Sequence, residues 1–374
     1  GQNFIGQPVS CSFEVNLGGC FPSADTITGE IVWTGAIDTT WTDPCNWNRV
    51  RVPQTDEKVI IPQVPSNNYP VIAGEVTIRS MDVDAGAEVL VKKTGVLRVE
   101  GSENYGILVQ GKLENRGTLY VDDISSTAIL VVNADAGSVF EFASLGLLGN
   151  TFIGSQASVG SGIFTADNSI FVVGNGNDNT SDTTFLSIDN VLGDALLLSG
   201  NFQFMDEGIG SNTRIEIGMN SAGGIGGTAI KLANSNGRSF HEFGGTLLIN
   251  GTENEAIDIR SANTFKIYDG ALMGISQADR GIVNEGTFDN AGSTYLTDIA
   301  KDAISNAGAF TNTGYLNVIG AVDGIADLGG TLDIDFSIGT VDFDQNLDLS
   351  QNTLEIDVDG ASSGLHDLLT TTGS

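Results

Sequence analysis

A small residue followed by an aliphatic one returns along this chain at intervals of 21 to 27 residues. Such a unit is too short for a propeller blade or for a βαβ unit, and the chain lacks the leucine frame of a leucine-rich repeat. The pairs are Gly106-Ile107, Ala128-Ile129, Ala229-Ile230, Ala256-Ile257, Gly281-Ile282, Ala303-Ile304 and Gly324-Ile325.

Between these pairs, apolar residues alternate with polar or small ones, as at Leu332, Ile334, Phe336 and Ile338. Gly, Asn and Asp separate the alternating runs and supply turns. Three short strands and three turns fill one repeat. We therefore predict an all-β fold, a right-handed parallel β-helix of three-strand coils stacked about 4.8 Å apart, with on the order of a dozen coils over roughly 60 Å.

The two best copies, residues 282–292 and 304–314, align almost residue by residue. Stacking places Asn284 beside Asn306 and Asn290 beside Asn312, so these amides are predicted to form ladders between coils. Gly286 and Gly308 are predicted corners, where glycine accepts a positive φ. The alternative is that each Asn-x-Gly only marks an independent hairpin.

A reversal of charge offers a test of this register. Asp279-Arg280 precedes Lys301-Asp302 by 22 residues. In register, Asp279 lies next to Lys301, and Arg280 next to Asp302. Each exposed pair contributes only about 0.2–1 kcal/mol, so these pairs serve as evidence of alignment rather than as a source of stability.

Residues 1–70 differ from the rest of the chain in composition. They hold Trp33, Trp41 and Trp47, all three cysteines and five of the seven prolines. We predict a small N-terminal β cap or module over 1–70 with the tryptophans in its core, and a β-helix over 71–374 that continues past the last residue. A Cys11–Cys20 bridge would leave Cys45 odd; three reduced cysteines are the alternative.

Composition and net charge exclude some classes of binding partner. The formal net charge of -31 is the opposite of a nucleic-acid footprint, and an anionic membrane would repel it. The chain contains no run of 18 or more apolar residues, so we expect no membrane insertion. A hydrophobic content of 40% is enough for a packed core.

Part of the chain resembles a known class of protein. Ile31-Val32-Trp33-Thr34-Gly35, Trp41-Thr42-Asp43-Pro44-Cys45-Asn46-Trp47 and Val59-Ile60-Ile61-Pro62 resemble an N-terminal module of large surface proteins exported by the type IX secretion route. The segments 330–358 and 364–373 resemble passenger coils of autotransporter-type adhesins. The resemblance implies an outer-surface location and contact with secretion machinery; it implies no chemistry.

Acidic loops are candidates for calcium. Asn175, Asn177, Asp178 and Asp182 form the richest cluster of oxygen ligands, which Ca²⁺ prefers. The favoured alternative is a solvated loop between coils. By period-two alternation, a further set of acids shares exposed strand faces: Asp333, Asp335, Asp342, Asp344, Asp348, Asp357 and Asp359.

Catalysis finds little support in the sequence. His241 and His366 are the two histidines, and no zinc protease motif or nucleophile elbow is present. We expect a secreted, non-catalytic adhesive rod that holds loops for contact with glycans or another surface. The alternative is a carbohydrate-active β-helix enzyme, a polysaccharide lyase or a glycoside hydrolase.

Overall fold

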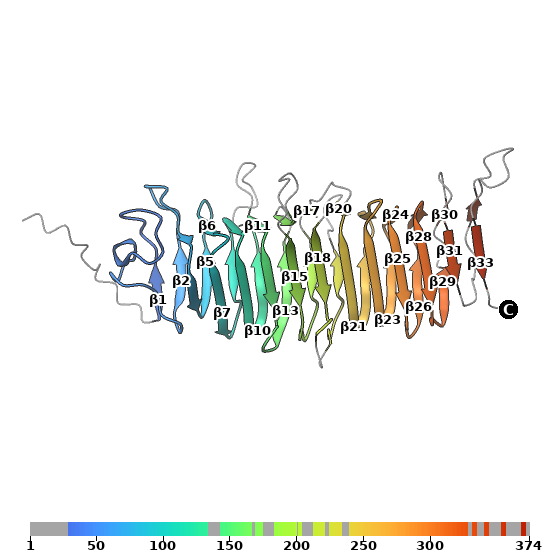
Figure 1. The fold of residues 1–374 in the computed structure, drawn as a ribbon, viewed down its shortest axis with the longest axis horizontal. Helices are drawn as coiled ribbons and strands as arrows, with labels where there is room; N and C mark the ends of the chain where they lie inside the picture. The colour runs from blue at the N-terminus through green and yellow to red at the C-terminus, as the bar shows by residue number, and fades with distance from the viewer. Residues whose placement is uncertain are drawn as a thin grey trace, which may run out of the picture.

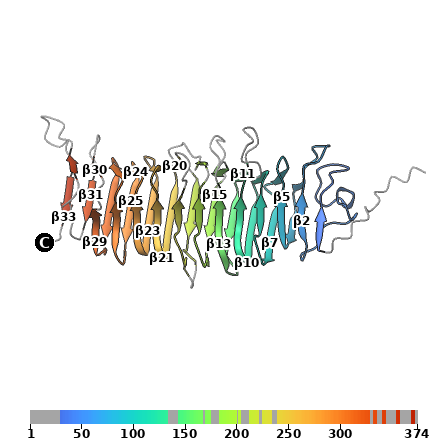
Figure 2. The same cartoon turned by 180° about the vertical axis from the view of Figure 1, so that it is seen from behind.

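The chain forms one long stack of parallel strands (Figure 1). The structure, a computed structural model, describes residues 29–133, 143–166, 169–174, 183–199, 201–203, 212–220, 224–233, 239–327, 331–334, 340–343, 353–356 and 368–371. Within these ranges no helix has the length and apolarity to cross a bilayer. Strand follows strand along the long axis from β1 to β33, and the view from behind shows the same order (Figure 2).

Each coil contributes a strand to as many as three faces. The first face contains β4 (Glu75–Ile78), β7 (Val96–Ser102), the start of β10 (Thr118–Val131), β12 (Asn150–Ile153), β15 (Thr184–Ile188), β18 (Thr213–Ile217), the starts of β21 (Thr246–Ile259) and β23 (Leu272–Asn284), β25 (Ser293–Thr297), β28 (Tyr315–Ile319), β31 (Thr340–Phe343) and β33 (Leu368–Thr371).

The second face contains β1 (Glu30–Val32), β2 (Lys58–Ile61), β5 (Ser80–Val83), β8 (Ile107–Val109), the end of β10, β13 (Val159–Thr165), β16 (Leu196–Leu198), β19 (Ile230–Leu232), the ends of β21 and β23, β26 (Asp302–Asn306) and β29 (Asp323–Asp327). The first and second faces are joined in one sheet because β10, β21 and β23 run through both.

The third face is built from two six-stranded sheets. One contains β3 (Val71–Ile72), β6 (Glu88–Val91), β9 (Lys112–Asn115), β11 (Ser144–Leu147), β14 (Ile170–Val173) and β17 (Asn201–Gln203). The other contains β20 (Ser239–Phe243), β22 (Asn263–Ile267), β24 (Thr287–Asn290), β27 (Ala309–Asn312), β30 (Thr331–Ile334) and β32 (Thr353–Ile356). All pairs of named strands within the described ranges are parallel, which confirms the predicted parallel β-helix.

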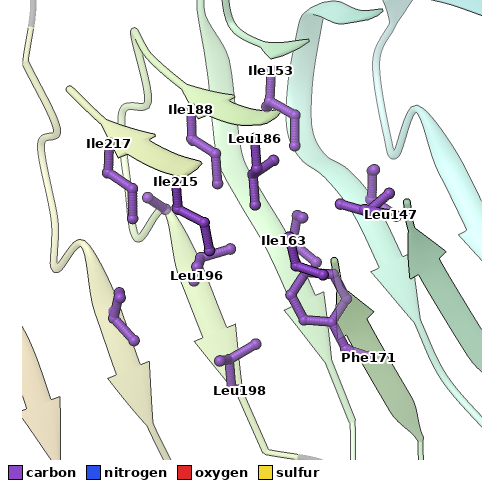
Figure 3. Packing of buried hydrophobic residues seen from close by; sticks show 14 of the residues in the cluster. Leu147, Ile153, Ile163, Phe171, Leu186, Ile188, Leu196, Leu198, Ile215 and Ile217 are labelled. Atoms are coloured by element: carbon purple, nitrogen blue, oxygen red, sulfur yellow. The ribbon is translucent and has the colours of Figure 1, made fainter. Parts of the chain in front are cut away.

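One interior column runs through the second face from end to end. Its members are at most 1% exposed, and the aliphatic residues of the predicted repeat all belong to it. Figure 3 shows part of this core, including Ile163 and Leu196. The column consists of Ile31, Val59, Met81, Ile107, Ile129, Ile163, Leu196, Ile230, Ile257, Ile282, Ile304 and Ile325.

Coil length varies along this column. Ile230, Ile257, Ile282, Ile304 and Ile325 are successive partners, as the repeat predicted. Between residues 129 and 230 the successive partners are instead 33 or 34 positions apart (163 − 129, 196 − 163 and 230 − 196). These coils are longer than those that follow Ile230, which hides the repeat from the sequence.

From Gly106 onward, the residue before each aliphatic of this column is glycine or alanine, because the next coil lies close to it. A Cβ on Gly281 would be 2.2 Å from the Ala303 carbonyl oxygen, and one on Gly162 would be 2.1 Å from the Ala195 carbonyl oxygen. Both distances are far below van der Waals contact. At these positions the stack tolerates only glycine or, as at Ala303, alanine.

The predicted amide ladders are present. Asn284 Nδ2 donates to Asn306 Oδ1 at 2.7 Å, and Asn290 Nδ2 donates to Asn312 Oδ1 at the same distance. All four side chains are buried. The first ladder joins consecutive coils at the end of the second face, and the second ladder joins them at the end of the third face, in addition to the backbone pairing.

The reason predicted for the two corner glycines is wrong. Gly286 and Gly308 lie at bends but do not have positive φ. Glycine is required there because an added Cβ on Gly308 would be 2.1 Å from the Gly286 carbonyl oxygen. The left-handed corner lies between the first and second faces, at positions that include Asp123, Gln277 and Asp298.

One of the two ion pairs predicted from the charge reversal is present. Lys301 Nζ lies 2.7 Å from Asp279 Oδ2, as predicted. The pairing of Arg280 with Asp302 is wrong: Arg280 Nη1 lies 3.5 Å from Glu255 Oε1 on the preceding coil. Asp302 instead accepts a hydrogen bond from Ser305 Oγ at 2.8 Å. Arg280 had a carboxylate on either side and pairs with Glu255.

The tryptophans form the core of the N-terminal segment, as expected. Trp47 packs edge-on against Trp33 and Trp41, with ring centroids 4.9 and 4.7 Å apart. The short 3-10 helix η1 (Pro44–Asn46) precedes Trp47. β1 pairs in parallel with β2, and β2 pairs in parallel with β5, so the stack begins inside the predicted module. The division at residue 70 stays a prediction.

The predicted cysteine pairing is wrong. Cys45 is disulfide-bonded and is therefore not the odd cysteine. Cys11 and Cys20 lie outside the described residues.

Candidate functional site

The residues predicted to bind calcium lie outside the described part of the chain: Asn175, Asn177, Asp178 and Asp182. His366 lies outside it as well. His241 belongs to β20, where its backbone pairs with Phe265. Over the described ranges, no group of three or more His, Cys, Asp and Glu side chains is arranged to hold a metal ion.

The predicted acidic faces are described only as backbone. Asp333 pairs in register with Thr311 and Glu355, and Asp342 pairs with Asn317. Of these two members, Asp333 therefore lies beside an acid of the neighbouring coil, Glu355, whereas both partners of Asp342 are uncharged, Asn317 and Thr370. The remaining predicted members, Asp335, Asp344, Asp348, Asp357 and Asp359, lie outside the described residues.

A polar pocket of about 340 Å³ opens near the N-terminal end of the second face. The volume is at the small end of the range for ligand sites and suits a single sugar unit or a similar polar molecule. The pocket is lined by Lys58, Arg79, Ser80, Gly101, Ser102, Glu103, Asn104 and Tyr105.

Backbone geometry holds the wall of this pocket in place. The wall is the loop 103–105 between β7 and β8. Ser102 Oγ donates to the Tyr105 carbonyl oxygen at 2.8 Å, and the Ser126 amide donates to the Asn104 carbonyl oxygen at 3.1 Å. Gly101, near the end of β7, has a φ of 83°, a conformation that favours glycine. The pocket is therefore formed before any ligand binds.

The two cations of the pocket differ in their environment. Lys58 Nζ lies 2.6 Å from Asp82 Oδ2 and 4.0 Å from Glu30 Oε1. No carboxylate in the described part of the chain forms an ion pair with Arg79, a half-buried residue that lines the pocket. In a chain of net charge -31, an uncompensated guanidinium beside a polar pocket is unusual, and it presents a planar donor fork to a ligand.

The ionisation of the Lys58–Asp82 pair is set by burial and by mutual attraction. Burial raises the pKa of Asp82 even though the hydrogen bond from Lys58 acts in the opposite direction. Burial lowers the pKa of Lys58, but the hydrogen bond and attraction of Asp82 outweigh it and leave a net increase. Asp82 Oδ1 is buried and has no hydrogen-bond partner. The carboxylate is thus only half satisfied.

A wider depression of about 470 Å³ lies beside the first face. The loop around Pro53 and β4 form its sides, and the buried Trp41 forms part of its wall. Asp56 and Glu75 contribute acidic groups. It is more open than the polar pocket.

An outward row of aromatic rings on the first face looks like a sugar platform but has its ring faces covered. Phe152 stacks on Tyr120 at 5.0 Å with 14° between planes, and Phe185 lies 5.6 Å beyond. The Arg98 guanidinium covers the other face of Tyr120 at 4.1 Å. Because a sugar stacks on a free ring face, this row stabilises the coils rather than offering a platform.

Sequence reasoning missed the polar pocket. Its residues come from three separate segments, around 58, 79 and 101–105, which only the coil register brings together. One signal was available: the polar run Ser102-Glu103-Asn104 interrupts the strand alternation shortly before Gly106-Ile107. The scarcity of cations could also have drawn attention to Arg79.

Residues 32–137 match a domain of unknown function, DUF8693. The match covers the tryptophan cluster and the coils through β10, and it contains both depressions described above. No curated protein and no solved structure matches the chain.

Proposed function

We propose that this chain is a secreted, non-catalytic β-helical rod at the outer cell surface, where it contacts glycans. The observation that best supports a rod is the unbroken interior column from Ile31 to Ile325. Twelve residues stacked about 4.8 Å apart give a rod of about 50 Å. Each coil is hydrogen-bonded to the next along its faces, so bending the rod would break many bonds at once.

Such a rod suits display. Its coils place turns along the outside at regular steps, and the charge of -31 limits self-association. The disulfide at Cys45 supports an oxidising compartment. Export by the type IX route and contact with its machinery rest on the resemblance of the N-terminal segment.

The polar pocket is the proposed glycan contact. Arg79 donates a planar fork, Asn104 and Tyr105 offer an amide and a phenol, and Glu103 accepts hydroxyl hydrogens. This combination recognises the hydroxyl groups of a sugar, and a carboxylate-bearing sugar adds a bidentate bond to Arg79. The pocket is large enough for one sugar unit of a glycan, and the other sugar units would remain outside the pocket.

A glycan array probed with the full chain tests this proposal. Binding to a defined subset of glycans is expected, with at least tenfold weaker binding by Arg79→Ala, as the loss of a charge-assisted hydrogen bond predicts. Arg214→Ala is the matched control, since Arg214 is exposed, pairs with Glu216 and lies on the first face. Equal binding by both variants would reject the pocket, and no binding by any form would reject glycan contact.

The runner-up function is a polysaccharide lyase or a glycoside hydrolase. Incubation with the glycans that bind separates the two proposals, because an enzyme releases shorter sugars and a display rod leaves them intact. Product formation at a rate that depends on the pocket residues would replace the non-catalytic proposal.

A further inference from the structure

A lysine and two carboxylates meet on three consecutive strands of the second face. Glu30 of β1 pairs in register with Lys58 of β2, and Ile60 of β2 pairs with Asp82 of β5. Lys58 Nζ consequently reaches across the coils to Asp82 Oδ2, at 2.6 Å, with Glu30 Oε1 at 4.0 Å on its other side.

Burial distinguishes this group from an ordinary surface ion pair. The side chains of Lys58 and Asp82 are 25% and 12% exposed. In the pair Lys301–Asp279, at almost the same distance of 2.7 Å, the values are 54% and 32%. Asp82 Oδ1 in addition lacks any hydrogen-bond partner. Removing a charge pair from water is costly, and a neutral covalent product would avoid that cost.

We propose that Lys58 and Asp82 condense to form an isopeptide bond between neighbouring coils. The Lys58 ammonium first transfers a proton to the Glu30 carboxylate. The neutral Nζ then attacks Cγ of Asp82, a new N–C bond forms, and one carboxyl C–O bond breaks. That oxygen leaves as water with protons from Nζ and Glu30. An ammonium and a carboxylate thus become one amide and one water, and no other reactant is required.

Proximity is the driving factor. A nitrogen hydrogen-bonded to a carboxyl oxygen lies about 3–3.5 Å from the carboxyl carbon, which is the near-attack range. Well-oriented intramolecular reactions reach effective concentrations of about 10⁵–10⁸ M, enough to favour an amide over free groups in water.

The bond would join the coil of β2 to the coil of β5. It would tie the tryptophan-containing segment covalently to the stack that follows, across the predicted boundary at residue 70. This inference concerns a modification and does not rest on the proposed glycan binding, although Lys58 also lines the polar pocket.

Intact mass spectrometry of the reduced full chain tests the bond. The purified protein is expected to weigh less than its sequence by one water molecule after prolonged incubation. Protease digestion should then yield a branched peptide that joins Lys58 to Asp82. A mass equal to that of the sequence would overturn the proposal.

Variants separate this reaction from dehydration elsewhere. Lys58→Arg keeps the positive charge and should retain the full mass, as should Asp82→Ala. Glu30→Gln should slow the mass loss by about 10²-fold or more, as expected for loss of a proton acceptor, and Glu30→Asp should recover part of the rate. Asp279→Ala, at the exposed pair, should leave the loss of water unchanged. Loss of water that persists in Lys58→Arg would overturn the proposal.

Discussion

Asn284 bonds three neighbouring segments through one buried amide. Its Nδ2 donates to Asn306 Oδ1 at 2.7 Å and to the Ala309 carbonyl oxygen at 2.8 Å, while its Oδ1 accepts from the Gly286 amide at 3.1 Å. The side chain is fully buried. An amide in this setting must keep its partners, because a buried polar group without one is costly. The ladder therefore fixes register as well as adding stability.

Asn306→Ala should weaken the stack locally. The substitution removes the acceptor of Asn284 Nδ2 and leaves a cavity, with an expected cost of about 1–3 kcal/mol. Stacked repeats can open locally, so the measurement is hydrogen exchange at the Ala307 and Gly308 amides, which donate to the Asn284 carbonyl oxygen. Their exchange should accelerate about 5- to 150-fold, whereas Asn317→Ala, at an outward position, should leave it nearly unchanged.

The stacked corner glycines make a second prediction. Gly308→Ala places a Cβ 2.1 Å from the Gly286 carbonyl oxygen, so the backbone must shift. We expect a loss of about 1–3 kcal/mol, as for other overpacked positions. Gly74→Ala is the matched control, because nothing lies within 4 Å of its Cβ and its φ is not positive. Urea unfolding followed by circular dichroism compares the two; equal midpoints would contradict the steric explanation.

The sequence predicted what the repeat makes periodic. Ile282 and Ile304 are spaced by one coil, so the parallel fold, the column and the asparagine ladders followed from alignment alone. It did not predict features that depend on distance between backbones. Gly308 could be recognised as a corner, but the carbonyl of Gly286 behind it is visible only in three dimensions. The pocket around Arg79 was missed for the same reason, since turns of unequal length bring its segments together.

The exposed pair between Asp279 and Lys301 should contribute little. Its side chains are 32% and 54% exposed, so water screens the attraction. A double-mutant cycle with Asp279→Asn and Lys301→Met should give a coupling free energy of about 0.2–1 kcal/mol that falls further in high salt. A coupling above 2 kcal/mol at physiological salt would show that the pair is far better shielded than its exposure indicates.

Calcium binding by Asn175, Asn177, Asp178 and Asp182 remains a prediction. If this loop binds Ca²⁺, millimolar calcium should raise the melting temperature and chelation should reverse the effect, since a ligand specific for the folded state stabilises it. The double variant Asp178→Asn, Asp182→Asn should lose the response. Magnesium at the same ionic strength controls for screening of the -31 charge, and an equal response to both ions would reject a specific site.

Glu57 should make the N-terminal segment sensitive to acid. The carboxylate is buried, accepts from Arg51 Nη1 at 2.6 Å and from the Gln54 amide at 2.9 Å, and lies 3.6 Å from Arg49 Nη1. The hydrogen bonds from Arg51 hold its pKa below 4.5, although burial acts in the opposite direction. A depressed pKa means that the folded state prefers the charged form. The stabilisation is therefore complete above the unfolded pKa and is lost as pH falls through the folded value.

Glu57→Gln isolates this contribution. At pH 7 the variant should unfold at lower urea than the parent chain, and the difference should shrink below pH 4.5 and vanish once Glu57 is protonated in the folded parent. Tryptophan fluorescence reports on this segment alone, because Trp33, Trp41 and Trp47 are the three tryptophans of the chain. Subtracting the variant from the parent cancels the opposite effect of Asp82, whose pKa is raised. A difference that stays constant with pH would show that Glu57 acts through its shape and not through its charge.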